Sequence, residues 1–121
     1  MAAAVSDYMP AKTARSKIKK ASADLTIKLK PTQDILKWAG RNKKKNQILI
    51  GFALEDKNLI ANAEKKLRQK NLDMIIANQP SAIAANKSTV HVKTKKTGWT
   101  TVEMKTKQII ANKIIRIAQE L

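Results

Sequence analysis

Apolar runs alternate with amphipathic segments along most of the chain. Three runs, Ala2–Ser6, Ile48–Leu54 and Leu72–Asn78, lack regular polar alternation and predict strands buried on both faces. Between the last two, leucine and alanine recur every fourth residue, which predicts a helix over Asn58–Lys70. Buried strands that alternate with amphipathic helices indicate parallel βαβ units in a three-layer α/β sheet.

A further strand and helix are predicted before Ile48. Residues 25–30 alternate apolar and polar positions, as a half-buried strand does, and Pro31 ends the run. Thr32 can cap the following helix, where Asp34 would lie in the positive first turn. Gly40 and the polar run after it predict the end of that helix.

The carboxyl-terminal third predicts an antiparallel addition to the sheet. Residues 88–105 alternate around Thr97–Gly98 and indicate a hairpin, and Thr106 is placed to cap a last helix. The apolar stripe of that helix is Ile110, Ile114, Ile117 and Leu121. We therefore expect one α/β domain of 121 residues, mostly parallel, with a terminal hairpin.

Composition narrows the classes of protein. The absence of cysteine excludes disulfides, thiolate metal sites and cysteine nucleophiles. The first residues do not form a signal peptide, and the sequence has no apolar run that could span a bilayer, so we predict a cytoplasmic protein without a membrane partner. The net charge of +16 implies anionic partners such as phosphorylated small molecules or nucleic acid.

Residues 9–24 are rich in small and basic residues and predict a flexible flap. Its "KIKK" stretch places Lys17, Lys19 and Lys20 together, and such a flap can close over phosphates. The alternative is a lysine run that is simply solvated.

Asp7 follows the first predicted strand, at the sheet edge where α/β proteins bind ligands. Its carboxylate could accept hydrogen bonds from a ribose or base, or help to hold magnesium. The alternative is an aspartate that hydrogen-bonds to its own loop.

Lys66 and Lys70 lie one helical turn apart and share a face, where an anion such as a triphosphate would relieve their repulsion. Phe52, the single phenylalanine, could stack on a nucleobase. The alternatives are a solvated basic face and ordinary core packing. We interpret His91 as structural, and Trp38 and Trp99 as packing residues.

Several classes of site have no support in the sequence. There is no glycine-rich phosphate loop, no Walker lysine motif and no metal-ligand spacing. Four aromatic residues do not make a stacking platform, which argues against a single-stranded nucleic-acid binder.

The stretches "AAVSDY", "KIKK", "LTIKLK" with "DIL", "GFALE" and "KLRQKNLDMIIAN", in this order and spacing, resemble the phosphopantothenate–cysteine ligases of coenzyme A biosynthesis. The resemblance implies a Rossmann- or ribokinase-like αβα fold, usually in a homodimer. It also implies that CTP, or ATP, with Mg²⁺ activates the 4′-phosphopantothenate carboxylate as an acyl-nucleotidylate. The cysteine amine then attacks and releases the nucleoside monophosphate.

The resemblance also assigns roles to residues. Lys17 would be the flap lysine that stabilises charge during acyl transfer, and Asp7 would hold the sugar or base. The other residues assigned to the nucleotide are Ala3, Lys30, Pro31, Thr32, Gln33, Phe52, Lys66 and Lys70.

This sequence departs from the family pattern. Gln33 stands where members usually have proline, and the stretch 79–88 lacks the family's Phe and Asp. The amino-terminal half, with its glycine-rich loop and an asparagine that serves the acyl intermediate, is absent. We therefore expect an incomplete sheet that needs a complementing half. The alternatives are a basic nucleic-acid-binding α/β domain and a structural dimerisation module.

Overall fold

A computed structural model describes residues 5–20 and 24–121. The chain divides into two compact units, which we treat separately: a ribbon unit that ends at Asp34 and a sheet unit, Ile35–Leu121. Most of the first predicted strand, Ala2–Ser6, lies outside the described residues. Its last two residues, Val5 and Ser6, are exposed and belong to no strand, so the prediction of a buried strand is wrong there.

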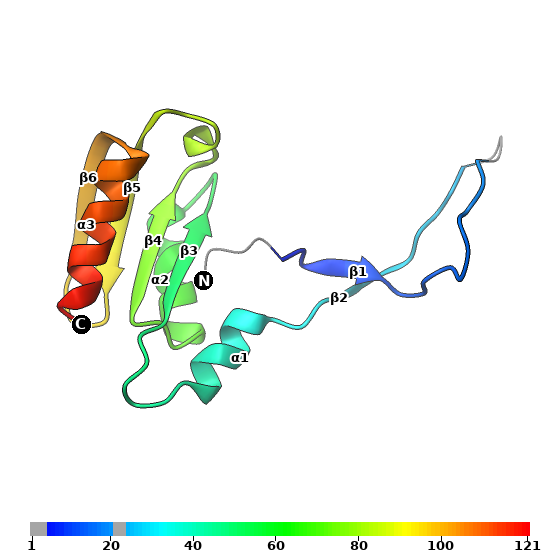
Figure 1. Cartoon of the computed structure of the whole chain (residues 1–121), viewed down its shortest axis with the longest axis horizontal. Coiled ribbons are helices and arrows are strands. Elements are labelled where there is room, and N and C mark those ends of the chain that lie inside the picture. Colours follow the sequence, from blue (N-terminus) through cyan, green and yellow to red (C-terminus); the bar gives the residue numbers. More distant parts are fainter. Residues whose placement is uncertain (1–4, 21–23) are drawn as a thin grey trace. The chain divides into compact units, whose positions relative to one another are not determined.

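The sheet unit contains one four-stranded sheet among the described residues, in the order β3-β4-β5-β6 (Figure 1). The strands are β3 (Ile50–Leu54), β4 (Met74–Asn78), β5 (Lys87–Thr94) and β6 (Trp99–Thr106). Strands β3 and β4 are parallel, and the other two neighbouring pairs are antiparallel. The hairpin expected at residues 88–105 is thus formed by β5 and β6.

Helices cover both faces of this sheet (Figure 1). They are α1 (Ile35–Asn42), α2 (Leu59–Gln69) and α3 (Lys107–Gln119), and a short 3₁₀ turn, η1 (Pro80–Ala82), follows β4. On one face, residues of α1 and α2 pack against alternate residues of β3 and β4: Leu36, Ala53, Ala63, Leu67, Ile75 and Ala77. On the other face, α3 packs against the remaining strand residues: Met74, Ile76, Val90, Val92 and Ile110.

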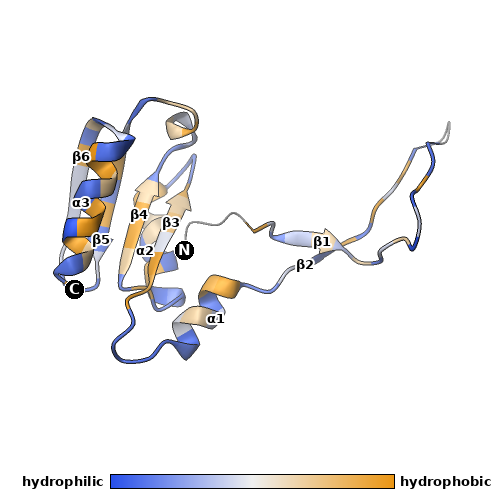
Figure 2. Ribbon diagram, viewed as in Figure 1, coloured by the Kyte–Doolittle hydropathy of each residue, from blue (hydrophilic) through white to orange (hydrophobic). Residues whose placement is uncertain are grey.

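These two cores confirm the predicted three-layer α/β fold. Strand β4 has helices on both sides and is hydrophobic along its length, as Figure 2 shows. The last helix also has its predicted cap, because the Thr106 side chain accepts a hydrogen bond from the Ile109 backbone N–H. Ile114, Ile117 and Leu121 pack against the α3-side core, as the apolar stripe predicted.

Helix α1 differs from the sequence prediction at both ends. It begins at Ile35 rather than after a Thr32 cap, and it continues through Gly40 to Asn42. A Cβ atom on Gly40 would lie 1.9 Å from the Lys70 carbonyl oxygen, so glycine here permits close packing of α1 on the end of α2. Trp38, predicted to be a packing residue, has 55% of its surface exposed.

The ribbon unit consists of two short antiparallel strands, β1 (Tyr8–Pro10) and β2 (Leu29–Pro31). The strand predicted over residues 25–30 is thus confined to its end, and Leu25, Ile27 and Leu29 are 56–64% exposed rather than half-buried. Residues 25–28 belong to no strand, so the alternation predicts a longer strand than the one that forms. No second layer covers either face among the described residues of this unit.

None of the described helices is both long enough and apolar enough to cross a membrane.

Candidate functional site

Two of the predicted nucleotide residues meet at β3. The Lys66 Nζ, on α2, donates a hydrogen bond of 2.7 Å to the backbone oxygen of Phe52, on β3. Because α2 packs against β3, this contact brings a cation to the backbone of a predicted stacking residue, whose side chain points to the sheet face opposite α2.

The Phe52 side chain is available for contact. Ala53 points into the core beneath α2, whereas Phe52 and Leu54 are 42% and 48% exposed. The expectation that the whole run Ile48–Leu54 is buried is therefore wrong at alternate positions. Phe52 belongs to neither core of the sheet unit, which argues against the alternative of core packing.

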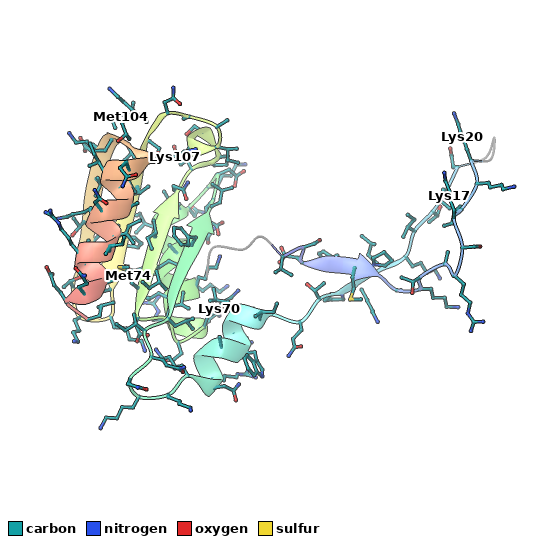
Figure 3. All side chains as sticks on the ribbon, in the orientation of Figure 1. Lys17, Lys20, Lys70, Met74, Met104 and Lys107 are labelled. Atoms are coloured by element: carbon teal, nitrogen blue, oxygen red, sulfur yellow. The ribbon has the colours of Figure 1, made fainter. Side chains whose placement is uncertain are left out.

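Lys70 lies one turn beyond Lys66, as their spacing predicted. Its backbone N–H bonds to the Lys66 carbonyl, and it forms the C-cap of α2 (Figure 3). Met74, which is also labelled in Figure 3, begins β4, the strand that follows α2 in the chain.

The ribbon unit brings Asp7 to the segment Lys30–Thr32. The Thr32 N–H donates to the Asp7 carbonyl at 2.9 Å, and the Thr32 hydroxyl donates to the Ser6 carbonyl at 2.5 Å. Lys30 pairs with Met9, and Pro31 with Tyr8, across the two strands. Gln33 follows in irregular, exposed backbone.

Lys17 lies in the exposed segment between β1 and β2, and Lys20 is close by along the chain (Figure 3). The described part of the predicted flap comprises residues 9–20 and Asp24. Ala3, the remaining predicted nucleotide residue, lies outside the described residues. The predicted set therefore divides between the units: Asp7, Lys17 and residues 30–33 belong to the ribbon, and Phe52, Lys66 and Lys70 to the sheet unit.

Sequence reasoning missed a carboxylate that joins three loops at one end of the sheet. Asp73 accepts hydrogen bonds from the Lys43 Nζ at 2.6 Å and from the Leu49 backbone N–H at 2.8 Å, and the Lys95 Nζ lies 3.5 Å away. Burial alone would raise the pKa of Asp73, but these donors outweigh it and hold the pKa below its usual value. We interpret the Asp73 cluster as structural, because the ammonium groups of Lys43 and Lys95 already contact the Asp73 carboxylate.

A second cluster ties the hairpin to α2. Glu64 accepts from the Lys93 Nζ at 2.6 Å and from the Trp99 Nε1 at 3.0 Å, and Lys93 lies 5.7 Å from the centre of the Trp99 ring. These two hydrogen bonds, Lys93 first, lower the pKa of Glu64. No sequence spacing could have indicated a pair 29 residues apart.

The described residues contain no group of three or more His, Asp or Glu side chains that could hold a metal ion.

Comparisons with known proteins agree with this fold. A family model for the DNA/pantothenate metabolism flavoprotein C-terminal domain matches residues 1–121. A cysteine/cysteine sulfinic acid decarboxylase from an unknown prokaryotic organism is 43% identical over 120 residues, which cover 96% of this chain and 33% of that protein. The coenzyme A biosynthesis bifunctional protein CoaBC of Borreliella burgdorferi is 43% identical over 118 residues, covering 96% and 30%.

A solved structure extends the agreement to three dimensions. The crystal structure of the C-terminal domain of a coenzyme A biosynthesis bifunctional protein CoaBC superimposes with a TM-score of 0.73 at 35% identity, covering 98% of this chain and 50% of that one. The chain spans about a third of the length of the two curated relatives. Because the family model matches residues 1–121, the chain belongs to the DNA/pantothenate metabolism flavoprotein C-terminal domain family.

Proposed function

We propose that the chain carries part of the nucleotide site of a phosphopantothenate–cysteine ligase in coenzyme A biosynthesis. The CoaBC relatives and the family match support this proposal. In the proposed reaction, a carboxylate oxygen of 4′-phosphopantothenate bonds to the α-phosphorus of CTP or ATP, and pyrophosphate leaves. The cysteine amine then attacks the acyl carbon, and the nucleoside monophosphate leaves.

The observation that carries the proposal is the contact between Lys66 and Phe52. A half-exposed ring offers a face for a nucleobase, and the ammonium on the backbone of the same residue offers charge for phosphates. Lys70, one turn further along α2, would supply a second cation to the same anion.

The ribbon unit carries the other residues that we propose for the nucleotide. Ala3 and Asp7 would contact the nucleotide, with Asp7 on the side of the sugar or base, and residues Lys30–Gln33 would approach the nucleotide. Lys17 would stabilise the charge that develops during acyl transfer. The hydrogen bond from Thr32 to Asp7 supports a joint role for these two segments, because it holds them side by side.

Magnesium would accompany the nucleotide, and when bound it would neutralise phosphate charge. Mg²⁺ in nucleotide sites usually needs one or two protein carboxylates besides phosphates and water. Asp7 is the carboxylate that would supply such a ligand.

Nucleotide titration followed by amide NMR tests the site. We expect saturable shifts at Phe52, Lys66 and Lys70 with CTP and Mg²⁺, and a comparison with ATP reports the base preference. Lys66→Gln should weaken binding about tenfold or more, the usual cost of losing a charge-assisted hydrogen bond. Lys113→Gln, an exposed lysine of α3, is the matched control and should leave the affinity unchanged. If both substitutions weakened nucleotide binding equally, the affinity would depend only on the net charge of the protein, which would contradict the proposal.

The open edge of the sheet supports a further part of the proposal, that catalysis needs a complementing half. In the described sheet β3 pairs with β4 alone, and its exposed residues Phe52 and Leu54 leave apolar surface beside that edge. We propose that the purified chain turns over no substrate until a protein that carries the family's amino-terminal half is added. Ligase activity of the chain alone would refute this.

We also propose that the working enzyme is a homodimer. The exposed apolar residues of the ribbon, Leu25, Ile27 and Leu29, support association, because isolated ribbons of this kind are unstable in water. Sedimentation equilibrium of the chain, alone and with the complementing half, measures this directly. A monomer under both conditions would contradict it.

A further inference from the structure

A cavity of about 510 Å³, which we call the α1 cavity, lies between α1 and the loop that connects α1 to β3. It belongs entirely to the sheet unit and shares no residue with those assigned to the nucleotide. The residues that line it are Trp38, Ala39, Asn42, Lys43, Lys44, Gln47, Ile48 and Leu49. Apolar and basic side chains therefore share this surface.

Hydrogen bonds hold the loop side of the α1 cavity in place. The Lys43 Nζ and the Leu49 N–H both donate to the Asp73 carboxylate, at 2.6 and 2.8 Å, so one carboxylate holds both ends of the loop. Between these ends, the Gln47 N–H donates to the Lys44 carbonyl at 3.0 Å, and the Lys44 N–H donates to the Gln47 side chain at 2.7 Å. A partner would thus meet a preformed wall and lose less conformational entropy on binding.

Apolar side chains remain exposed at this cavity. Ile35 and Trp38 lie one turn apart on α1 and are 43% and 55% exposed, and Ile48, on the loop side, is 50% exposed. None of the three belongs to either core of the sheet unit. Exposed apolar surface of this kind marks interaction sites, and tryptophan is enriched among the residues that contribute most to binding between proteins.

The charge around the cavity has one sign. Between Asp34 and Glu55 the chain has five basic residues and no acidic one. Of the basic residues, Arg41, Lys44 and Lys45 are exposed, and no carboxylate lines the cavity. A rim of this sign is complementary to acidic residues of a partner.

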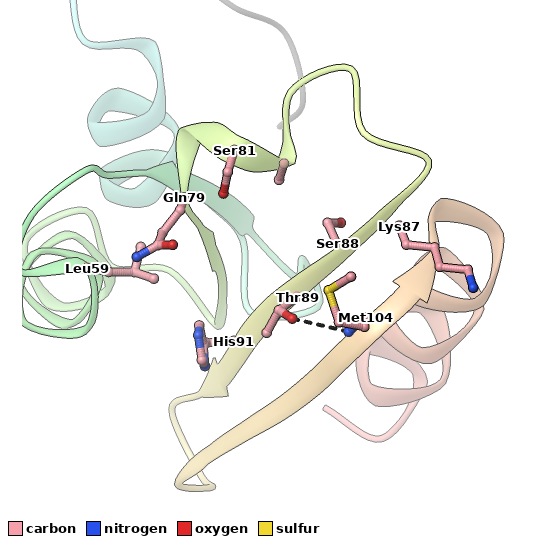
Figure 4. A pocket seen from close by; sticks show the side chains of 9 residues that line it. Leu59, Gln79, Ser81, Lys87, Ser88, Thr89, His91 and Met104 are labelled. Carbon is pink, nitrogen blue, oxygen red and sulfur yellow. Dashed lines mark hydrogen bonds between the residues drawn. The ribbon is translucent and has the colours of Figure 1, made fainter.

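Another cavity of the sheet unit, at the carboxyl end of β4, has no such rim (Figure 4). Its hydroxyl groups come from Ser81, Ser88 and Thr89, and the Thr89 hydroxyl already accepts the Met104 N–H at 3.1 Å. The Lys87 side chain points away from these hydroxyls in Figure 4. Of the two cavities, the α1 cavity is the one that combines exposed apolar side chains with several cations.

We propose that the α1 cavity binds an acidic protein segment that inserts one large apolar side chain. That side chain would lie against Trp38 and Ile48, and aspartate or glutamate residues on either side of it would pair with the basic rim. A second copy of this chain suits the surface less, because a chain of net charge +16 offers few acidic residues. A nucleic acid also suits it less, because Trp38 is the one aromatic residue in a lining that is otherwise aliphatic or polar.

The test is an NMR titration of the full chain, at constant ionic strength, with the capped peptide Glu-Asp-Phe-Leu-Asp-Glu. Trp38 and Trp99 give two indole N–H signals, and Trp99 is the internal reference because its N–H already donates to Glu64. We expect saturable shifts of the Trp38 indole and the Ile48 amide, and none at the Trp99 indole. The same peptide with serine in place of phenylalanine and leucine should bind at least about tenfold more weakly, because it has no apolar side chain to bury.

Variants separate this surface from general charge. Trp38→Ala should weaken the peptide affinity about tenfold or more, and an unchanged Trp99 signal reports that the variant is folded. The double substitution Lys44→Gln with Lys45→Gln should weaken it about fivefold. Its matched control, Lys107→Gln with Lys113→Gln, removes two exposed lysines of α3 and should leave the affinity within about twofold.

Three results would overturn the proposal. The first is no shift at Trp38, or equal binding of the serine peptide. The second is an oligothymidylate that binds at Trp38 more tightly than the acidic peptide, since the partner would then be a nucleic acid. The third is a Trp38 signal that moves when the free chain is diluted, which would assign the surface to a second copy.

Discussion

Residues 72–78 of the sheet unit and residues 25–30 of the ribbon both predict strands that bury apolar side chains, but only the first segment buries them. In β4, Met74, Ile75 and Ala77 are fully buried, whereas in the ribbon Leu25 and Ile27 remain more than half exposed. The difference is the covering layer. Strand β4 lies between α3 on one face and α1 with α2 on the other, whereas the described residues of the ribbon form no helix that could cover its strands. An apolar pattern thus sets which side chains share a face, and a second layer decides whether that face is buried.

The largest expected effect tests this difference in burial directly. Ile75→Ala removes a fully buried side chain between β4 and the α2-side core, and it should lower the free energy of unfolding by about 2–5 kcal/mol. Leu25→Ala in the ribbon should change it by less than about 0.5 kcal/mol. Urea unfolding of the full chain measures both. Similar losses would mean that the ribbon is packed in solution.

The second test concerns the close approach of α1 to the end of α2. Gly40→Ala should destabilise the sheet unit by about 1–3 kcal/mol, because the new Cβ meets the Lys70 carbonyl. Helix propensity alone predicts the opposite sign, a gain of about 1 kcal/mol. Gly98→Ala is the control, since nothing lies within 4 Å of a Cβ there. Thermal unfolding of the two variants decides the sign.

The third test uses the Asp73 cluster, which fixes one end of the sheet. Asp73→Asn should cost about 1–2 kcal/mol at neutral pH, because the ion pair with Lys43 is lost and the ammonium can then donate only to a neutral amide oxygen. Asp24→Asn, in the exposed ribbon, should cost nothing measurable. Urea midpoints at pH 7 compare the two.

The pH dependence of the same cluster follows from the lowered pKa of Asp73. Its stabilising contribution is complete above the unfolded-state pKa of about 4 and is lost as the pH falls toward the lower folded-state pKa. Acid titration should therefore destabilise the wild-type protein more steeply below pH 4 than it destabilises Asp73→Asn. Parallel curves would exclude an ionic role for Asp73.

The smallest expected effect concerns the cap of α3. Thr106→Ala should cost about 0.5–1 kcal/mol, because the Ile109 N–H loses its acceptor, and Thr106→Ser should retain most of the stability. Thr26→Ala in the ribbon has no such role and serves as the control. Chemical unfolding resolves a difference of this size only if all three variants share one m-value.

Local patterns in the sequence determined much of the sheet unit. The continuous apolar run Leu72–Asn78 predicts strand β4, and the apolar residue at every fourth position predicts helix α2. Each pattern is typical of one kind of secondary structure. Thr106 and the stripe that begins at Ile110 likewise place α3, since capping and amphipathicity act over a few residues.

The tertiary structure decided which distant residues meet. Lys66 reaches the Phe52 carbonyl across 14 residues, and Lys43 reaches Asp73 across 30, because the strands bring those ends together. It also decided that Leu25 and Leu29 remain exposed, although their alternation equals that of a half-buried strand. Periodicity is a property of one segment, whereas burial and contact depend on what packs against it, and that is set by the whole fold.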